Sequence, residues 1–397
     1  MKQNTVVVAA WPGYFPESVQ RAFEDETGYV IHFVSLPADE DLLGWFEGRE
    51  WENAGESDRF KPHLIMPSAF VAQALKKGGH IQDFNRELLS DGVLPLTSAR
   101  QYNPDFDPDN EFVIPYAWGA TGIAYDSDRL NGLPESWAAL FGGDPLEDEV
   151  EDNLNFDRIS QIALLDDARF TLGSVLLFQG KSPNTDNPED VRQAANFLIE
   201  LSRKHRERPG NKDYFEITYE ESNMPTLLRE EKIGLSMTWS ADVTTATREE
   251  TESDSGKKSD QLSSGNLGIR LALPNEGSIV FRDSFVISSG LTPVENQGVH
   301  ALVDFMLRPE IAAEVTNSSF FANTIIEANP YVDRFIFNGP SYFIHPSRKN
   351  KFLSELAPKM REVYQIAWAH VQYDVFWGDN SVKAANKEIE DHFTGGN

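Results

Sequence analysis

The stretch VVVAAWPGYFPESVQRAFEDETGYVIHFV, residues 6–34, predicts a strand, a helix and a second strand in succession. Residues 6–8 are consecutive valines, as in a buried strand. Residues 16–27 carry apolar side chains on one helical face and are followed by Gly28, a residue that often terminates helices. Residues 29–34 are again strand-like. Repeated units of this kind are typical of an α/β fold with parallel strands.

Further strand-like and helical runs follow along the chain. The longest helix is expected to begin at Asn187 and Pro188, a common pair at the cap and first turn of a helix. The last 50 residues are expected to be helical and rich in aromatic side chains. Six more runs predict strands: residues 63–66, 122–125, 161–165, 232–237, 269–273 and 278–287. Three polar segments are expected to be surface insertions: residues 48–61, 142–155 and 249–264.

The composition narrows the class of protein. Lys and Arg number 35 against 63 Asp and Glu, so the net charge of −28 disfavours binding to nucleic acid or to an anionic membrane surface. The acidic excess has two readings, general solubility or a field that attracts cations. There are no cysteines, which excludes disulfides and thiolate chemistry. No run approaches the roughly 20 apolar residues of a membrane span, and residues 5–11 are too short for a signal-peptide core.

The sequence lacks the common enzyme motifs. It contains no G-x-x-x-x-G-K-[ST], no G-x-G-x-x-G, no H-E-x-x-H and no G-x-S-x-G pattern. The eight histidines are scattered, and no two of them are spaced four residues apart. We therefore expect no catalytic residues, no metal site and no cofactor.

Eight short segments, taken in order, resemble the spermidine/putrescine-binding proteins of ABC transporters, which have the type II periplasmic binding fold. Each segment alone is a weak signal, but their order and spacing together make the resemblance specific. The segments are AWPGY (10–14), LIMPS (64–68), IPYAWGATG (114–122), LDDA (165–168), MTWSAD (237–242), FRD (281–283), LRPE (307–310) and FFAN (320–323).

The resemblance implies two α/β lobes, each a mostly parallel sheet flanked by helices, with a ligand cleft between them. Residues 1–116 with 276–320 would form lobe 1, and residues 117–275 with 321–397 would form lobe 2. Residues 115–119 and 273–274 would be hinges, with a third crossing near Phe321. The implied role is that of an extracytoplasmic binding protein, periplasmic or lipid-anchored and monomeric. It would deliver a polyamine or related small amine to an inner-membrane permease.

The candidate site combines aromatic rings with acids, which suits an organic ammonium ion because ring faces and carboxylates both attract cations. An aromatic box is expected from five residues: Trp11, Tyr14, Trp239, Phe281 and Phe321. Asp242 and Asp283 are the expected amine ligands, and Asp167 is a third candidate that could instead cap a helix. The family pattern adds Ser68, Phe70 and Phe170 to the binding positions.

The sequence departs from the family where the far end of a polyamine would be held. Gly13 and Phe170 occupy acidic family positions, and Pro12 and Phe70 occupy polar ones. We therefore expect a monocationic amine or a short diamine to compete well with spermidine.

Three alternatives to transport of a polyamine stay open. The chain could be a sensory receptor that reports the ligand to a membrane sensor. It could bind a ligand of another class that has one cationic end. It could also be an enzyme built on the same fold.

Overall fold

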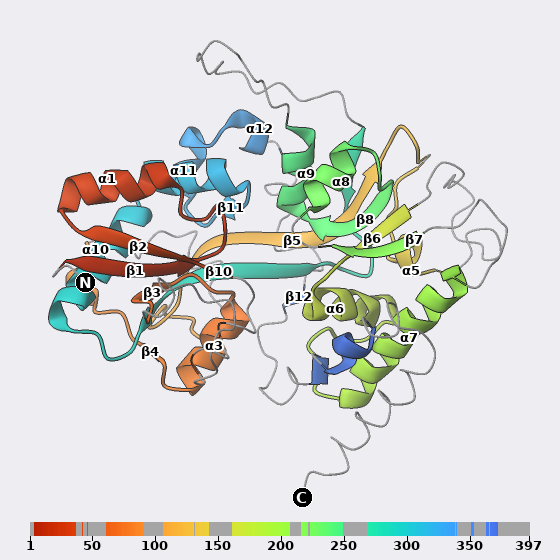
Figure 1. The fold of residues 1–397 in the computed structure, drawn as a ribbon, viewed down its shortest axis with the longest axis horizontal. Helices are drawn as coiled ribbons and strands as arrows, with labels where there is room; N and C mark the ends of the chain where they lie inside the picture. Colours follow the sequence, from red (N-terminus) through yellow and green to blue (C-terminus); the bar gives the residue numbers. More distant parts are fainter. Residues whose placement is uncertain are drawn as a thin grey trace, which may run out of the picture. The chain divides into compact units, whose positions relative to one another are not determined.

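The computed structural model describes two compact units (Figure 1). Unit 1 comprises Met1–Gly119 and Phe281–Phe343, and unit 2 comprises Ala120–Val280 and Ile344–Asn397. The described residues are 4–36, 42, 46, 61–90, 106–130, 132–142, 161–206, 216–220, 223–248, 268–337, 339, 351–352, 363–364 and 366–371. Nearly all of the three polar segments and most of the last 50 residues lie outside these ranges.

The chain passes from one unit to the other inside two long strands. Strand β5 (Ile114–Asp126) leaves unit 1 after Gly119, and strand β10 (Ile279–Ser288) re-enters it at Phe281. The lobes expected from the sequence had these boundaries at residues 116 and 276, and had residues 321–397 in lobe 2. In the structure, residues 321–343 cluster with unit 1.

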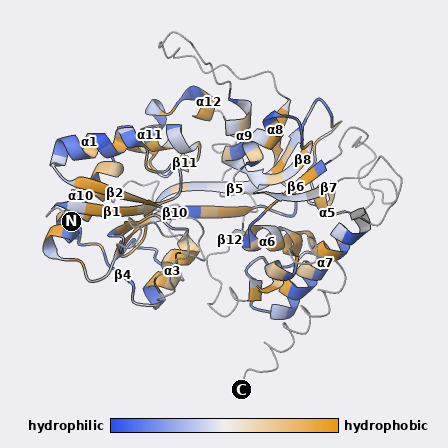
Figure 2. Ribbon diagram, viewed as in Figure 1, coloured by the Kyte–Doolittle hydropathy of each residue, from blue (hydrophilic) through white to orange (hydrophobic). Residues whose placement is uncertain are grey.

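The sheet of unit 1 contains the strand–helix–strand unit expected at the start of the chain. β1 (Thr5–Ala10) runs parallel to β2 (Val30–Ser35) and to β3 (Leu64–Ile65). β10 pairs antiparallel with β3 and with β4 (Ile81–Gln82). The short β11 (Ala322–Asn323) pairs with the unit 1 part of β5. Figure 2 shows β10 as hydrophobic with one hydrophilic interruption, and its sequence IVFRDSFVIS has Arg282 and Asp283 near the middle.

Helices cover both faces of this sheet. α1 (Glu17–Thr27) and α11 (Pro309–Ser319) lie on one face and α3 (Ala69–Lys77) on the other (Figure 1). α10 (Pro293–Met306) packs on β1 and begins with a capping box, in which Thr292 and Glu295 bond to each other's backbone amides. The remaining short helices are η2 (Arg86–Leu88), η3 (Ile326–Tyr331) and α12 (Arg334–Phe337).

Unit 2 is a second mixed sheet. β8 (Leu235–Trp239) pairs antiparallel with β5 and parallel with β6 (Gln161–Leu165), which in turn is parallel to β7 (Glu216–Glu220). β9 (Ile269–Ala272) pairs antiparallel with β5, and β12 (Lys351–Phe352) pairs with the unit 2 end of β10. The expected site residues of unit 2 lie at or shortly after the ends of β6 and β8.

The helices of unit 2 also lie on two faces. α8 (Met224–Arg229) and α9 (Ser240–Thr247) cover one face, and α6 (Ala168–Phe178) and α7 (Pro188–Arg206) cover the other (Figure 1). The short α5 (Ala138–Phe141) precedes β6 in the chain. α7 begins at the predicted proline. Among the described residues, no helix is long and apolar enough to cross a membrane.

Candidate functional site

Most of the expected site residues lie at or shortly after the end of a strand or within β10, and they fall into two sets. Seven belong to unit 1: Trp11, Tyr14, Ser68, Phe70, Phe281, Asp283 and Phe321. Four belong to unit 2: Asp167, Phe170, Trp239 and Asp242. Loops that follow neighbouring parallel strands meet at one edge of a sheet, so this placement can bring side chains of distant sequence together.

In unit 1, Asp283 is an acid enclosed by the protein. The residue is only 4% exposed. The hydroxyl of Tyr14 donates a hydrogen bond to its carboxylate. Burial and then the charge of Asp283 raise the pKa of Tyr14 well above its usual value, so Tyr14 stays protonated and remains a donor. The backbone of Asp283 also forms an isolated antiparallel bridge with Ser68, which fixes the acid beside the loop that follows β3.

Aromatic rings surround this acid–tyrosine pair. The ring of Tyr14 lies 5.5 Å from that of Tyr116 and 5.8 Å from that of Phe321. Phe321 in turn packs edge-to-face on Phe281, with centroids 5.0 Å apart and an interplanar angle of 88°. We call these five residues, Tyr14, Tyr116, Phe281, Asp283 and Phe321, the Tyr14 cluster. Its rings and carboxylate have the chemistry expected for an ammonium ion.

Tyr116 is the member of this cluster that the sequence analysis missed. It lies within residues 115–119, which the sequence predicts as a hinge, and in the structure these residues belong to the 13-residue strand β5. Alternation along β5 sets Tyr116 against the ring of Phe285, at 4.5 Å between centroids. A strand pattern assigned to residues 114–126 would have drawn attention to it.

Two other expected residues of unit 1 pack in or against its apolar core. Phe70, at the start of α3, is 4% exposed and lies within an apolar cluster that includes Val7 and Ile65. Trp11 is partly buried and packs against the same apolar cluster. Both therefore contribute to packing.

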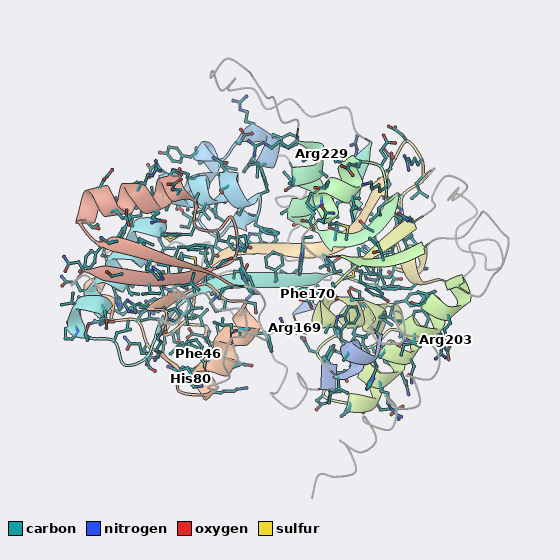
Figure 3. The ribbon with its side chains drawn as sticks, in the orientation of Figure 1. Phe46, His80, Arg169, Phe170, Arg203 and Arg229 are labelled. Carbon is teal, nitrogen blue, oxygen red and sulfur yellow. The ribbon has the colours of Figure 1, made fainter. Side chains whose placement is uncertain are left out.

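In unit 2, Trp239 and Phe170 are in contact. Their ring centroids are 4.4 Å apart at an interplanar angle of 74°. Trp239 ends β8, and Phe170 lies in the first turn of α6, next to Arg169 (Figure 3). Asp167 caps that helix, since its carboxylate accepts bonds from the backbone amides of Arg169 and Phe170 at 2.9 and 3.1 Å. The helix cap that sequence allowed for Asp167 is thus present.

Asp242 is the second acid of this group. One carboxylate oxygen accepts a bond from the hydroxyl of Thr238 at 2.5 Å and another from the amide of Trp239 at 3.2 Å. The residue is partly exposed, but its carboxyl group is enclosed. Burial raises its pKa to about 6, and the bonds from Thr238 and Trp239 partly offset that increase. We call Asp167, Phe170, Trp239 and Asp242 the Trp239 cluster.

Comparison with known proteins places this geometry in a family. Residues 22–329 match the family of bacterial extracellular solute-binding proteins. The chain belongs to this family. It is a family of binding proteins and not of enzymes.

Two relatives of this solute-binding protein have names that include putrescine. It is 25% identical over 384 residues to the putrescine/agmatine-binding protein of Pseudomonas aeruginosa, covering 93% of this chain and 92% of the relative. It is 23% identical over 380 residues to the putrescine-binding periplasmic protein PotF of Escherichia coli, covering 94% and 92%.

A solved structure confirms the expected fold class. The spermidine/putrescine transporter substrate-binding protein PotD of Streptococcus pneumoniae superposes with a TM-score of 0.67 at 17% identity. The match covers 94% of this chain and all of the other. The α/β architecture expected for a type II periplasmic binding protein is therefore present.

The two departures at acidic family positions, Gly13 and Phe170, have structural reasons to persist. Gly13 is exposed and has a φ of 85°, a conformation that side chains other than glycine rarely adopt. Phe170 is 8% exposed against Trp239. An acid at position 13 would strain the backbone, and an acid at position 170 would bury a carboxylate. Neither substitution would therefore be neutral.

Gly119 of this solute-binding protein is required by space and not by its backbone angle. A Cβ atom there would lie 2.6 Å from Cζ of Phe281 and 3.0 Å from Cδ1 of Phe321. The glycine therefore lets both rings lie against β5. We expect Gly119→Ala to destabilise unit 1 by about 1–3 kcal/mol through overpacking, measured by urea unfolding.

A double-mutant cycle checks the cause of that destabilisation. Phe281→Leu removes the ring atoms that the new methyl group would meet. In the Phe281→Leu background, Gly119→Ala should therefore cost much less than in the wild type. If the two effects simply add, contact with Phe281 is not the reason for the glycine.

Proposed function

We propose that this solute-binding protein captures a small organic amine outside the cytoplasm and delivers it to the permease of an ABC transporter. The observation that carries the proposal is the buried carboxylate of Asp283 within the rings of the Tyr14 cluster. A carboxylate of low exposure contributes strong, charge-assisted hydrogen bonds to a cation. The neighbouring ring faces add about 0.5–2 kcal/mol per cation–π contact. The names of the relatives, which include putrescine, agmatine and spermidine, support this ligand class.

The Trp239 cluster also takes part in binding under this proposal. Trp239 offers a ring, and Asp242 offers a second carboxylate. Phe170 stands where the family pattern has an acid, so this chain presents an apolar surface to part of the ligand. The preferred ligand is accordingly a monocationic amine or a short diamine, with a far end that needs no buried counter-charge.

We propose that the protein acts as a monomer, in the periplasm or anchored by a lipid outside the inner membrane. A receptor that signals to a membrane sensor would use the same ligand clusters. A pull-down with the candidate permease and with the candidate sensor, each with and without putrescine, separates the two roles.

The test of the amine proposal compares two ligands of matched length. Putrescine and n-butylamine share a four-carbon chain and differ by one ammonium group. Isothermal titration calorimetry should show binding of both, each with an affinity comparable to or higher than that of spermidine. Absence of binding for all three amines would refute the proposed ligand class, and spermidine binding far above both would refute the predicted apolar far end.

Asp242 gives the binding a pH dependence. Its folded-state pKa of about 6 lies above its usual 3.8, so the carboxyl group gains a proton as the pH falls below 6. An amine then competes with that proton, and the affinity for putrescine should fall about tenfold between pH 7 and pH 5.

Asp242 affects the stability of the protein with the opposite pH dependence to its effect on affinity. Between about pH 4 and pH 6 the folded protein binds more protons at Asp242 than the unfolded chain does. This group alone therefore lowers the stability as the pH rises through that window. Asp242→Asn should flatten the pH profile of putrescine affinity, whereas an affinity that is already flat in the wild type would remove Asp242 from the site.

A further inference from the structure

The hydroxyl group of Tyr116 is buried in unit 1. Tyr116 is 6% exposed, and its hydroxyl oxygen has no hydrogen-bond partner within the part of the chain that the structure describes. A buried hydroxyl that leaves water without gaining a partner lowers the stability of the folded protein. Such a group in a native protein calls for an explanation, and a bound water or a ligand can supply the missing partner.

The ring that carries this hydroxyl is held on two sides. It stacks on Phe285 at 4.5 Å with an interplanar angle of 20°, and it meets the ring of Tyr14 edge-on at 5.5 Å. The hydroxyl therefore has a defined position and is not free to swing toward another acceptor. Phe285 and Asp283 are two residues apart on β10, so their side chains project from the same face of the strand.

Asp283 makes this position favourable for a cation. Burial and then the charge of Asp283 raise the pKa of Tyr116 well above its usual value, which keeps the hydroxyl neutral. The proton of Tyr14 is already directed to Asp283. The oxygens of Tyr14 and Tyr116 therefore both have lone pairs for a donor beside the carboxylate.

We propose that Tyr116 is a ligand-contacting residue, whose hydroxyl oxygen accepts a hydrogen bond from a primary ammonium group of the amine. This inference rests on the proposed function. A primary ammonium group has three N–H donors, which match the carboxylate of Asp283 and the oxygens of Tyr14 and Tyr116. Tyr116 then adds to the affinity and selects a group with several N–H donors.

A buried water is the competing partner for this hydroxyl. Tyr116 also lines a small cavity with Thr316, Phe321 and Asn323, and this cavity has room for about one water molecule. A water bonded to Tyr116 would stabilise the ligand-free protein, whereas a hydroxyl reserved for the ligand would destabilise it. The sign of the change in melting temperature when the hydroxyl is removed therefore distinguishes a hydroxyl bonded to water from an unpaired hydroxyl.

The experiment is Tyr116→Phe, which removes the hydroxyl and keeps the ring. The melting temperature of the ligand-free variant should rise by about 2 °C, because an unpaired buried hydroxyl is removed. The Kd for putrescine should increase about tenfold, because a hydrogen bond to a charged group is lost. The two changes run in opposite directions.

Tyr364→Phe is the matched control. Tyr364 is fully buried in unit 2, and its hydroxyl donates to the carbonyl of Pro183 at 2.9 Å. Removing that hydroxyl should lower the melting temperature and leave the Kd for putrescine unchanged. The pair of variants thus differs in whether the lost hydroxyl already had a protein partner.

The outcomes are distinct. An unchanged Kd for Tyr116→Phe overturns the inference, and so does a lower melting temperature, which would assign the hydroxyl to water or protein. If the wild type itself binds neither putrescine nor n-butylamine nor spermidine, the proposed function fails, and the inference fails with it. A higher melting temperature together with weaker binding supports the inference.

Discussion

Asp283→Asn is expected to weaken putrescine binding by about tenfold to a hundredfold. The substitution keeps the shape of the side chain but removes the charge that an ammonium ion meets, and a charge-assisted hydrogen bond contributes about 1.5–3 kcal/mol. The carboxylate is 4% exposed, so water does not screen the loss. Calorimetry at fixed pH and salt measures the change.

Asp107→Asn serves as its control. Asp107 is a buried acid of unit 1 at 3% exposure, and its carboxylate accepts bonds from the amides of Glu111, Phe112 and Val113 at 2.8–3.0 Å. Its loss should lower stability with little effect on affinity. Equal losses of affinity in both variants would show that Asp283 acts only through the stability of unit 1.

Trp239→Ala is expected to have an effect of similar size. The indole ring would contribute stacking and a cation–π contact to the ligand, and its removal also leaves Phe170 without the ring that it packs against. We expect the Kd for putrescine to rise about tenfold or more, with a moderate decrease in stability. Fluorescence of the remaining tryptophans and calorimetry follow the two effects separately.

Trp368→Ala controls for the loss of a buried tryptophan in the same unit. Trp368 is 5% exposed, donates to Asp166 at 3.2 Å and packs edge-on against Tyr219, but it does not belong to the Trp239 cluster. Trp368→Ala should decrease stability and leave the Kd for putrescine unchanged. If Trp239→Ala retains wild-type affinity for putrescine, Trp239 is a packing residue.

The first strands and helices follow directly from the sequence because local patterns determine them. The apolar run at Val6–Val8 and the glycine after α1 each reflect a preference of a few neighbouring residues. Gly28 adopts a φ of 73° at the end of α1, as its position in the sequence suggests. The α/β class was predictable for the same reason, whereas the type II periplasmic binding fold was predicted from the resemblance of eight short segments; the solved structure of a relative agrees with both.

The composition of the Tyr14 cluster was only partly predictable. Tyr14 and Asp283 are more than 260 residues apart, and only the family pattern joined them before the structure placed a hydrogen bond between them. Tyr116 was missed because a strand was predicted only at residues 122–125, so its side chain was not assigned to a face of β5. The requirement for Gly119 depends on where two distant rings lie, which no local pattern encodes.

The insertion of residues 120–280 of unit 2 between the unit 1 parts of β5 and β10 has a consequence for the synthesis of the chain. β3 pairs with β1 on one side and with β10 on the other, but β10 is synthesised roughly 160 residues after β5 leaves unit 1. At about 5–20 residues per second, the ribosome needs about 10–30 s to supply it. During that interval an early-folded first segment would present an open strand edge, which is prone to pair with other chains. Native folding is therefore favoured when the first segment folds late. A chaperone should raise the yield of native protein if it keeps this segment unfolded until the whole chain has been released.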